Sequence, residues 1–525
     1  MGELVRDRTY LPPTDELKDF AQMSDIPTPT SVLEETRPIP EAAPIASRAK
    51  TILWNFASLS AASVFSRIAS LATNAVLGRR ISASGYGVAG IAQTVTLYFS
   101  LLSELGLGTV AVREGAQNPA RLQCTISSML GLRLVLALAM IPFGLLTAQF
   151  LPYSESSRNL FRIYLFTLPI QAFEVEWVFR SVQKMYLNTV LQVSASLLTF
   201  VLTVALIQDS RNLIRVAGIA AIVAGATVAL GIRLLHREGF NAWPEFSVRE
   251  FRYLLGQSLP LCATSLAVTL YSQVNNLILG YFRSDSDVGM YIAATRLSWV
   301  CYSPMWFYFT AMAPALSEAW ASSVDGARSL LSNSVRVSTT ISIGGGLVAA
   351  SVSQWVITRI FGKTFSGAEG AFDILIWTGV VIAIGHNWGE LCVAAKRNRL
   401  LMQATCLGAC VNLVVCTVTV SRMGIRGAAF SNLLAEIALH IFLVVSFGSH
   451  MGWSVLRNAL RPLGAGAVAY LVMLMTRTSG ISLCPIFTAL SYLVVLIMIG
   501  GVTAHDLNKL RAMMPVRRFV PDSAT

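Results

Sequence analysis

The ionisable side chains that interrupt long apolar stretches are the residues of this chain best suited to chemistry. Arg67 and Arg296 each lie inside such a stretch. A charge at the centre of a membrane helix costs about 2.5 to 3.5 kcal/mol, so most such groups face a water-filled cavity or a partner. A guanidinium group binds phosphate oxygens through two parallel hydrogen bonds. We therefore expect Arg67 and Arg296 to bind an anionic ligand. The competing interpretation is an interhelical ion pair or a carbonyl-capped arginine.

Two further sets of charged residues lie toward one end of their apolar segments. Arg133 and Glu104 fall at similar depth on neighbouring predicted helices, which favours a structural ion pair. Arg133 stays a binding candidate of second rank. Glu176 can pair with Arg180 one turn later, whereas Glu174 has no evident partner in the sequence. Glu174 is therefore a candidate for a protonatable group.

Two histidine and glutamate pairs are spaced four residues apart. His386 and Glu390 form one pair, and Glu436 and His440 form the other, so each pair shares one face of a helix. If these faces meet, they make a protonatable cluster that could couple the protein to a proton or sodium gradient. The competing interpretation is a set of satisfied polar groups near helix ends. Spacing alone is weak evidence for a metal, and we predict no metal site and no cofactor.

Amide and aromatic side chains gather on two consecutive apolar segments. Asn275 and Asn276 lie on the first segment, and Trp299, Tyr302 and Trp306 lie on the second. Amide hydrogen bonds and aromatic planes suit a ligand such as a sugar. Packing in the protein core or at the membrane interface is the commoner fate of these residue types.

These candidates must be positioned by membrane-spanning helices. The 525 residues are 54% hydrophobic and 13% charged, and the mean hydropathy of +0.60 exceeds what a soluble core could bury. About 14 apolar windows of about 20 residues, each long enough to cross the bilayer, follow one another between residues 51 and 503. Continuous apolar runs indicate helices and exclude barrel strands. We predict an all-α integral membrane protein.

Charge near the predicted helix ends indicates the orientation. An even number of crossings places both termini on one side, and the Lys and Arg residues number about 21 on that side and about 12 on the other. Both termini are therefore expected in the cytoplasm. The net charge of +12 is then explained by the Lys and Arg residues that set the topology and attract anionic lipid headgroups. No nucleic-acid partner is expected. The eight cysteines show no zinc-like spacing and are expected to pack as small hydrophobic residues.

The chain divides into segments of different composition. An internal repeat supports two lobes, because Asn74-x-x-x-Gly78 resembles Asn276-x-x-x-Gly280. A two-residue insertion in the following hairpin would align two helix pairs about 204 positions apart. The alternative is that the two phrases are similar only by chance, because glycines are common in apolar sequence. We expect a disordered cytoplasmic tail at residues 1–50 and a basic cytoplasmic tail at 506–525. Between them we expect an N-lobe with helices 1 to 6 (51–240), a C-lobe with helices 7 to 12 (241–455), and helices 13 and 14 (456–505).

Four phrases of the sequence belong together: Trp54-Asn-Phe-Ala-Ser, Leu77-Gly-Arg-Arg-Ile-Ser-Ala-Ser-Gly-Tyr-Gly, Glu104-Leu-Gly-Leu-Gly and Val288-Gly-Met-Tyr-Ile-Ala-Ala-Thr-Arg-Leu. They resemble the polysaccharide-export flippases of the multidrug/oligosaccharidyl-lipid/polysaccharide exporter superfamily. The resemblance covers roughly residues 51–450. It implies two six-helix bundles in a V, as in the multidrug exporters of the MATE type, with two further C-terminal helices. The Pro-rich tail before the first helix departs from the family pattern.

The resemblance also implies a function. The cargo would be an undecaprenyl-diphosphate-linked oligosaccharide repeat unit, moved across a bacterial inner membrane to the periplasmic leaflet for surface or exopolysaccharide synthesis. Arg67 and Arg296 would then receive the diphosphate or its sugars. Membrane lipids, polysaccharide polymerase and export proteins, and H⁺ or Na⁺ are the expected partners.

Two other classes of protein remain as alternatives. A multidrug exporter of the same fold would carry a small amphiphile. A membrane polymerase would be expected to carry a long periplasmic loop, and the predicted outside loops are short. The sequence has no phosphate loop and no H-E-x-x-H or G-x-S-x-G motif, which fits a transporter and not an enzyme.

Overall fold

The computed structural model describes residues 45–209, 213–478 and 483–500. In this part of the chain the regular secondary structure is helical, without strands. Residues 45–50 already belong to the first helix and not to a tail, and the rest of the two expected tails, 1–44 and 506–525, lies outside the described residues. Residues 1–54 and 55–525 form separate compact units, and the arrangement below is that of residues 55–525.

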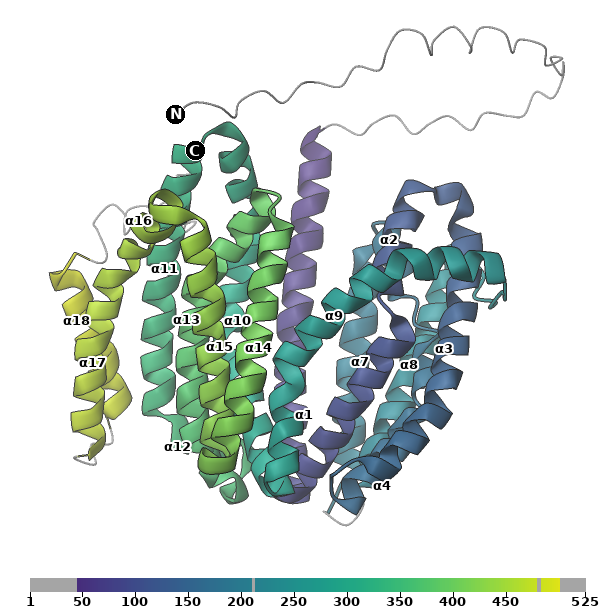
Figure 1. Ribbon diagram of the computed structural model, residues 1–525, viewed down its shortest axis with the longest axis horizontal. Coiled ribbons are helices and arrows are strands. Elements are labelled where there is room, and N and C mark those ends of the chain that lie inside the picture. Colours follow the sequence, from purple (N-terminus) through teal and green to yellow (C-terminus); the bar gives the residue numbers. More distant parts are fainter. Residues whose placement is uncertain (1–44, 210–212, 479–482, 501–525) are drawn as a thin grey trace, which may run out of the picture. The chain divides into compact units, whose positions relative to one another are not determined.

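The longer helices follow one another with short connections, as shown in Figure 1. Their bounds are α1 Ile45–Glu104, α2 Leu107–Gln117, α3 Leu122–Phe150, α4 Glu155–Leu165, α7 Met185–Leu206, α8 Ile214–Arg237, α9 Val248–Phe282, α10 Asp285–Ser322, α11 Val324–Ser351, α12 Ser353–Phe361, α13 Glu369–Ala394, α14 Asn398–Met423, α15 Ile425–Ser446, α17 Leu460–Thr478 and α18 Cys484–Met498. The short helices of the described residues are η2 Pro119–Arg121, α5 Leu168–Gln171, α6 Glu176–Ser181, η3 Lys363–Ala368, η4 Ser449–Trp453, α16 Ser454–Leu456 and η5 Arg457–Ala459.

Eight helices in the described residues are long and apolar enough to cross a membrane, or up to ten if each bent pair counts as one span. The chain is thus an all-α, multi-pass membrane protein, as predicted. The count of 14 crossings stays a prediction. One reason is that α1 merges two expected crossings across a non-helical break at Ser82, where φ is 63°. Another is that the apolar stretch at 160–180, one of the windows counted in the sequence, is divided among α4, α5 and α6.

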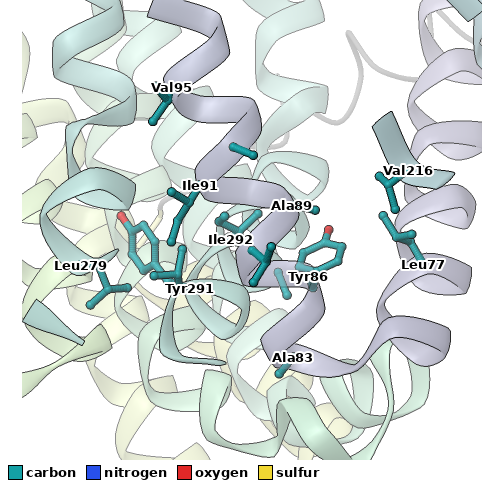
Figure 2. Packing of buried hydrophobic residues seen from close by; sticks show 14 of the residues in the cluster. Leu77, Ala83, Tyr86, Ala89, Ile91, Val95, Val216, Leu279, Tyr291 and Ile292 are labelled. Atoms are coloured by element: carbon teal, nitrogen blue, oxygen red, sulfur yellow. The ribbon is translucent and has the colours of Figure 1, made fainter. Parts of the chain in front are cut away.

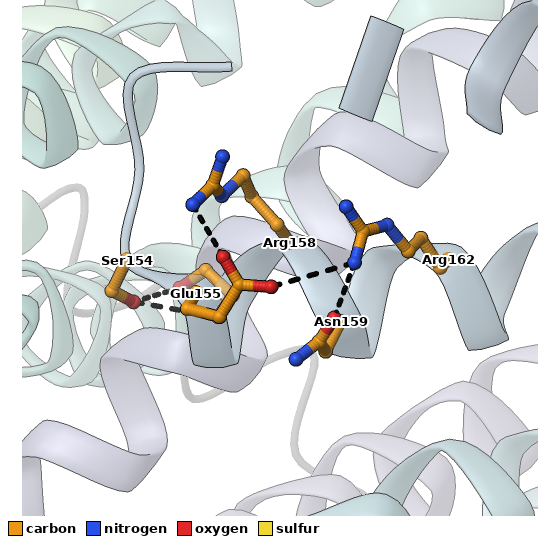
Figure 3. A network of polar contacts seen from close by, with 6 residues as sticks. Ser154, Glu155, Arg158, Asn159 and Arg162 are labelled. Carbon is orange, nitrogen blue, oxygen red and sulfur yellow. Dashed lines mark hydrogen bonds and ion pairs between the residues drawn. The ribbon is translucent and has the colours of Figure 1, made fainter. Parts of the chain in front are cut away.

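The first bundle is built from α2, α3, α4, α7 and α8, which contact one another in series. At one end of this bundle, α4 begins after Ser154, whose hydroxyl accepts a hydrogen bond from the Ser157 amide at 3.3 Å. The Glu155 carboxylate then lies between the guanidinium groups of Arg158 and Arg162 (Figure 3). A serine cap with an acidic first turn explains why the chain re-enters a helix here.

The second bundle is built from α10, α11, α13, α14 and α15. The hairpin of α17 and α18 packs on its outer side against α11. The Tyr492 hydroxyl of α18 donates to the Thr340 carbonyl of α11 at 3.0 Å, and Arg477 of α17 pairs with Glu369 and Asp373 of α13. These contacts attach the last two helices to the second bundle only, among the residues described.

The bent helix α9 contacts both bundles. Its first part, Val248–Cys262, packs on α2 and α3, where Glu250 pairs with Arg121 at 3.2 Å. Its second part, Ser265–Phe282, packs on α10, α14 and α15. The expected boundary at residue 241 therefore assigns to the second lobe a segment that is packed on the first.

The hydrophobic cores show where the two bundles meet. One cluster contains residues of α1, α4 and α8 together with residues of α10, α13 and α14, and Figure 2 shows part of it, with Tyr86 and Ile91 of α1 near Tyr291 and Ile292 of α10. This end of the bundles, next to the break at Ser82, is called the hairpin end below. At the opposite end the cores are separate, one for each bundle. The bundles are thus joined at the hairpin end.

Candidate functional site

A polar cavity of about 300 Å³ lies in the first bundle beside α10. Its lining includes Ser70, Thr73 and Asn74 of α1, Gln93 of the second half of α1, Tyr164 of α4, Thr199 and Thr203 of α7, and Arg296 of α10. Eight of its 15 lining residues carry a hydroxyl or amide group and six are apolar, and Arg296 is the one charged residue of this lining. Such a lining suits a hydrated, anionic or sugar-like ligand.

Arg296 is held at the cavity wall by neutral groups. Its Nη1 donates to the Tyr86 hydroxyl at 2.8 Å and its Nη2 to the Gln93 Oε1 at 3.3 Å. The guanidinium carbon also lies 5.3 Å from the centre of the Tyr86 ring. No carboxylate pairs with Arg296 among the described residues, so its positive charge is not neutralised by the protein.

An aromatic cavity of about 350 Å³ lies in the second bundle. It is lined by Trp299, Tyr302, Trp306 and Phe309 of α10, by Gly379, Ala383 and His386 of α13, and by Arg67 of α1. The side chain of Arg67 is exposed and makes no hydrogen bond or ion pair with any residue in the described part of the chain. A guanidinium without a protein partner beside aromatic planes is a ready site for an anion.

One face of α1 connects the two cavities. Arg67, Ser70 and Asn74 are spaced three and four residues apart, which places them in one row on the helix. Arg67 lines the aromatic cavity, and Ser70 and Asn74 line the polar one. The two arginines predicted to bind an anion therefore line two separate cavities along one helix face and do not share one pocket.

Backbone contact closes the hairpin end between the cavities. A Cβ atom built on Gly87 would overlap the Asp285 carbonyl oxygen, and one built on Gly289 would overlap the Ala83 carbonyl oxygen. The two contacts are equivalent under a shift of 202 residues, since 289 − 87 and 285 − 83 both give 202. Asn74 and Asn276 differ by the same number, so the repeat is in register at this point and has no insertion in the hairpin.

Side chains from each bundle reinforce this closure. Arg79 donates from Nε to the Ile360 carbonyl at 2.9 Å and from Nη2 to the Arg359 carbonyl, near the end of α12. The Tyr153 hydroxyl donates to the Leu277 carbonyl of α9 at 3.3 Å. Burial raises the pKa of Tyr153 to about 12, so this hydroxyl stays protonated and can donate at neutral pH.

The two histidine and glutamate pairs form as the spacing predicted. His386 Nε2 lies 3.2 Å from Glu390 Oε1, and His440 Nε2 lies 3.2 Å from Glu436 Oε2. Helices α13 and α15 pack together, and the His440 ring lies against the backbone of Gly385, next to His386. His386 also stacks near Trp306 and Phe309, so this pair borders the aromatic cavity whereas the Glu436 pair is buried behind it.

The other predicted candidates lie outside both cavities. Arg133 is 7% exposed and donates to the Glu174 carbonyl at 3.0 Å, while the Glu174 side chain itself is exposed. The Asn275 amide donates to Tyr291 and Ala428, at 3.0 and 2.8 Å, inside the second bundle.

Asn276 is likewise bonded to protein groups and not directed into a cavity. Its amide donates to Thr94 at 3.3 Å and to Gln273 at 3.0 Å. Arg133, Asn275 and Asn276 line neither of the two cavities described, and their role in binding stays a prediction. Among the residues described, no three His, Cys, Asp or Glu side chains are grouped as a metal site.

Sequence reasoning missed the neutral residues of the polar cavity. Gln93 and Tyr164 line this cavity, and Gln93 Nε2 donates to the Tyr164 hydroxyl at 3.1 Å. Arg296 links Gln93 to Tyr86, which lies just behind the cavity wall. Tyr86 stands in the Gly-Tyr-Gly phrase after the hairpin, and that phrase was the one available signal. Uncharged residues in apolar helices carry no energetic penalty large enough to single them out.

Comparisons with known proteins agree with this architecture. The model of the family described as "Polysaccharide biosynthesis protein" matches residues 52–320, and that of the MatE family matches residues 260–418. A probable low-salt glycan biosynthesis flippase, Agl15 of Haloferax volcanii, is 24% identical over 253 residues, which are 46% of this chain and 53% of that protein. The chain thus matches about half the length of this curated relative.

Two solved structures share the fold. The lipid II flippase MurJ, in an inward closed conformation, is 12% identical with a TM-score of 0.67, over 86% of this chain and 99% of that one. An inward-facing multidrug resistance MATE transporter is 14% identical with a TM-score of 0.61, over 73% and 95%. These likenesses show the fold of membrane transporters. The chain belongs to the family described as "Polysaccharide biosynthesis protein", whose model matches half of it.

Proposed function

We propose that this protein is a flippase that moves an undecaprenyl-diphosphate-linked oligosaccharide from the cytoplasmic to the periplasmic leaflet of a bacterial inner membrane. The observation that carries the proposal is the free guanidinium of Arg67, which lies on the same face of α1 as the wall of the polar cavity. Two cationic, separately lined cavities suit a cargo with an anionic diphosphate and a hydrated glycan. The flippase relative named above supports the class of cargo.

The joined hairpin end supports loading from the opposite end. With both termini in the cytoplasm, the hairpin end faces the periplasm, and the bundles part toward the cytoplasm where the cargo is made. Arg67 and Arg296 then bind the diphosphate or its first sugar. The surrounding hydroxyl and amide groups of the polar cavity bind the remaining sugars.

The His386, Glu390, Glu436 and His440 cluster is proposed to couple this movement to a proton or sodium gradient. His386 lines the aromatic cavity, and the Glu436 and His440 pair lies where α15 packs on α13. Protonation of the cluster would therefore change both the charge at the cavity and the contact between these two helices. Glu174 is exposed and distant from this cluster in the contacts described, and it stays a secondary coupling candidate. Polymerase and export proteins are the proposed partners for the translocated unit.

Multidrug export is the second candidate, favoured by the aromatic lining around Arg67 and by the MatE match over residues 260–418. Deleting the gene in its host and measuring lipid-linked repeat units by leaflet, with surface polysaccharide, separates the two. Accumulation in the cytoplasmic leaflet with loss of surface polymer supports the flippase. Unchanged polysaccharide with altered drug tolerance contradicts it and supports drug export.

Complementation of the deletion strain tests whether Arg67 belongs to the binding site. The wild-type gene and Arg233→Ala are expected to restore the polymer, because Arg233 is exposed on α8 and lines neither cavity. Arg67→Ala is expected to fail, and Arg67→Lys to restore it in part because a point charge replaces the two-pronged donor. Full restoration by Arg67→Ala would remove this residue from the site.

A further inference from the structure

Tyr86 belongs to two systems at once. Its ring is 2% exposed and lies in the core that joins the bundles at the hairpin end. Its hydroxyl accepts the hydrogen bond from Arg296 and donates to Asn74 Oδ1 at 2.9 Å. Arg296 and Asn74 both line the polar cavity, whereas Tyr86 itself does not. One side chain therefore contacts two residues of the cavity wall and the core of the closure.

The ring of Tyr86 packs between the bundles on two phenylalanines of the second bundle. It makes edge contacts with Phe361 at 6.1 Å and with Phe365 at 5.7 Å, measured between ring centres. Both phenylalanines are fully buried. Phe361 ends α12, the helix whose last carbonyls accept hydrogen bonds from Arg79. The position of the Tyr86 ring thus affects the part of the closure built on α12.

An anionic ligand and Tyr86 compete for the same guanidinium. Arg296 uses Nη1 for Tyr86 and Nη2 for Gln93, which are the two nitrogens that bind a phosphate in the bidentate mode. A phosphate bound there draws Arg296 away from the hydroxyl and from the face of the ring. A hydrogen bond from Arg296 to a charged phosphate oxygen is stronger than one to a neutral hydroxyl, so replacement of Tyr86 by the ligand is favourable.

We infer that Tyr86 couples ligand binding at Arg296 to opening of the hairpin end. When the cavity is empty, Arg296 holds the Tyr86 ring against Phe361 and Phe365, and the closure is stable. When an anion takes Arg296, the ring loses both its hydrogen bond and its cation–π contact, and the closure weakens. This inference rests on the proposed function, because it takes the diphosphate of the cargo as the anion.

The test follows exposure of a reporter cysteine at the closure. Ile91 is 1% exposed and lies where α1 meets Gly280 of α9, so it becomes accessible only when the bundles separate at this end. Ile91→Cys in a cysteine-free background is reconstituted in liposomes and labelled from the hairpin side with a membrane-impermeant maleimide. The probe is undecaprenyl diphosphate, and its binding is measured separately by thermal shift of the same sample.

The expected result is about a tenfold rise in labelling rate when the probe binds, the size of one lost hydrogen bond plus one cation–π contact. Tyr86→Phe retains the ring and is expected to raise labelling about threefold without probe and to reduce the further rise. Tyr86→Ala should give fast labelling that no longer responds. Tyr492→Phe is the matched control, since it removes a buried tyrosine hydroxyl that lines neither cavity, and it should label as the parent does.

Two failures are distinguishable. If the probe binds and raises labelling equally in the parent, Tyr86→Phe and Tyr86→Ala, the coupling role of Tyr86 is overturned while the flippase proposal stands. If the probe does not bind the parent at all, the diphosphate part of the proposed function fails. The rates without probe still decide on Tyr86 in that case, because unchanged basal labelling in Tyr86→Ala would overturn its role in the closure.

Discussion

Gly87 and Gly289 lie against each other across the two bundles, and neither position has room for a methyl group. Each is the counterpart of the other in the internal repeat. The contact is therefore a crossing of two equivalent helices around the axis that relates the halves of the protein. Small residues permit such close backbone approach between membrane helices.

Gly87→Ala is expected to separate the bundles at the hairpin end. Overpacking typically costs about 1 to 3 kcal/mol, which corresponds to a shift of about 5- to 150-fold toward the open state. Labelling of the Ile91→Cys reporter should rise accordingly, and transport should fall because the closed state is scarce. Gly225→Ala is the control, since nothing lies within 4 Å of a Cβ atom at that position. Unchanged labelling of Gly87→Ala would mean that the contact is not part of a gate.

Arg67 and Arg133 are expected to respond in opposite ways to replacement by alanine. Arg67 has no hydrogen bond or ion pair among the described residues, so Arg67→Ala should leave the melting temperature unchanged and weaken undecaprenyl diphosphate binding about tenfold or more. Arg133 is buried and bonded to the Glu174 carbonyl, so Arg133→Ala should lower the free energy of unfolding by about 1 to 3 kcal/mol without affecting binding. Thermal unfolding in detergent and a binding titration check both. The reverse pattern would exchange their roles.

Glu436→Gln is expected to abolish the dependence of transport on an ion gradient. Glu436 is 7% exposed and paired with His440, and the glutamine keeps the shape while removing the exchangeable proton. The measurement is cargo movement in proteoliposomes with and without an imposed proton or sodium gradient. Glu155→Gln, at the exposed start of α4, should behave as wild type. Equal wild-type rates with the gradient present and collapsed would end the coupling proposal.

The loop before α7 gives a pH-dependent prediction. A hydrogen bond to Glu238 raises the pKa of Lys184, so the folded state binds this proton more tightly than the unfolded state. The stabilisation is complete below the unfolded value of about 10.4 and is lost as pH rises through the folded pKa. Because Lys184 is partly exposed, Glu238→Gln should cost only about 0.2 to 1 kcal/mol near neutrality. Unfolding by denaturant at pH 7 and pH 12 checks the sign, and a difference that persists at pH 12 would contradict it.

Asn275 tests the division between binding and framework residues. Its amide donates to Tyr291 and Ala428 within the second bundle, and the side chain is 3% exposed. Asn275→Ala should therefore destabilise the protein by about 1 to 3 kcal/mol. Binding of undecaprenyl diphosphate by the folded fraction should be unchanged. Weakened binding with normal stability would return Asn275 to the site.

The sequence predicted features that depend on one helix at a time. Apolar length indicates a membrane helix, and a spacing of four residues places His386 beside Glu390 whatever packs against them. Features that depend on the packing of a neighbouring helix could not be predicted from the sequence. The row from Arg67 to Asn74 is visible in the sequence, but its division between two cavities is set by α10 and α13 on one side and α4 and α7 on the other.

The break at Ser82 and the path of α9 show the same limit. A serine at a positive φ has no sequence signature, because its conformation is imposed by the contacts around it. Similarly, the first part of α9 packs on the first bundle through the pairing of Glu250 with Arg121, which lie far apart in the chain. The two-residue insertion expected in the hairpin is wrong, because the contacts of Gly87 and Gly289 are related by a shift of 202 residues.

The single core shared by both bundles at the hairpin end has a pharmacological consequence. An inhibitor applied from that side first meets the buried apolar side chains of the shared core. In the orientation proposed above this side is the periplasm, so a compound that competes with the cargo is expected to arrive from the cytoplasm or to wait for turnover. Screening on inverted vesicles would then find compounds that screening on intact cells overlooks.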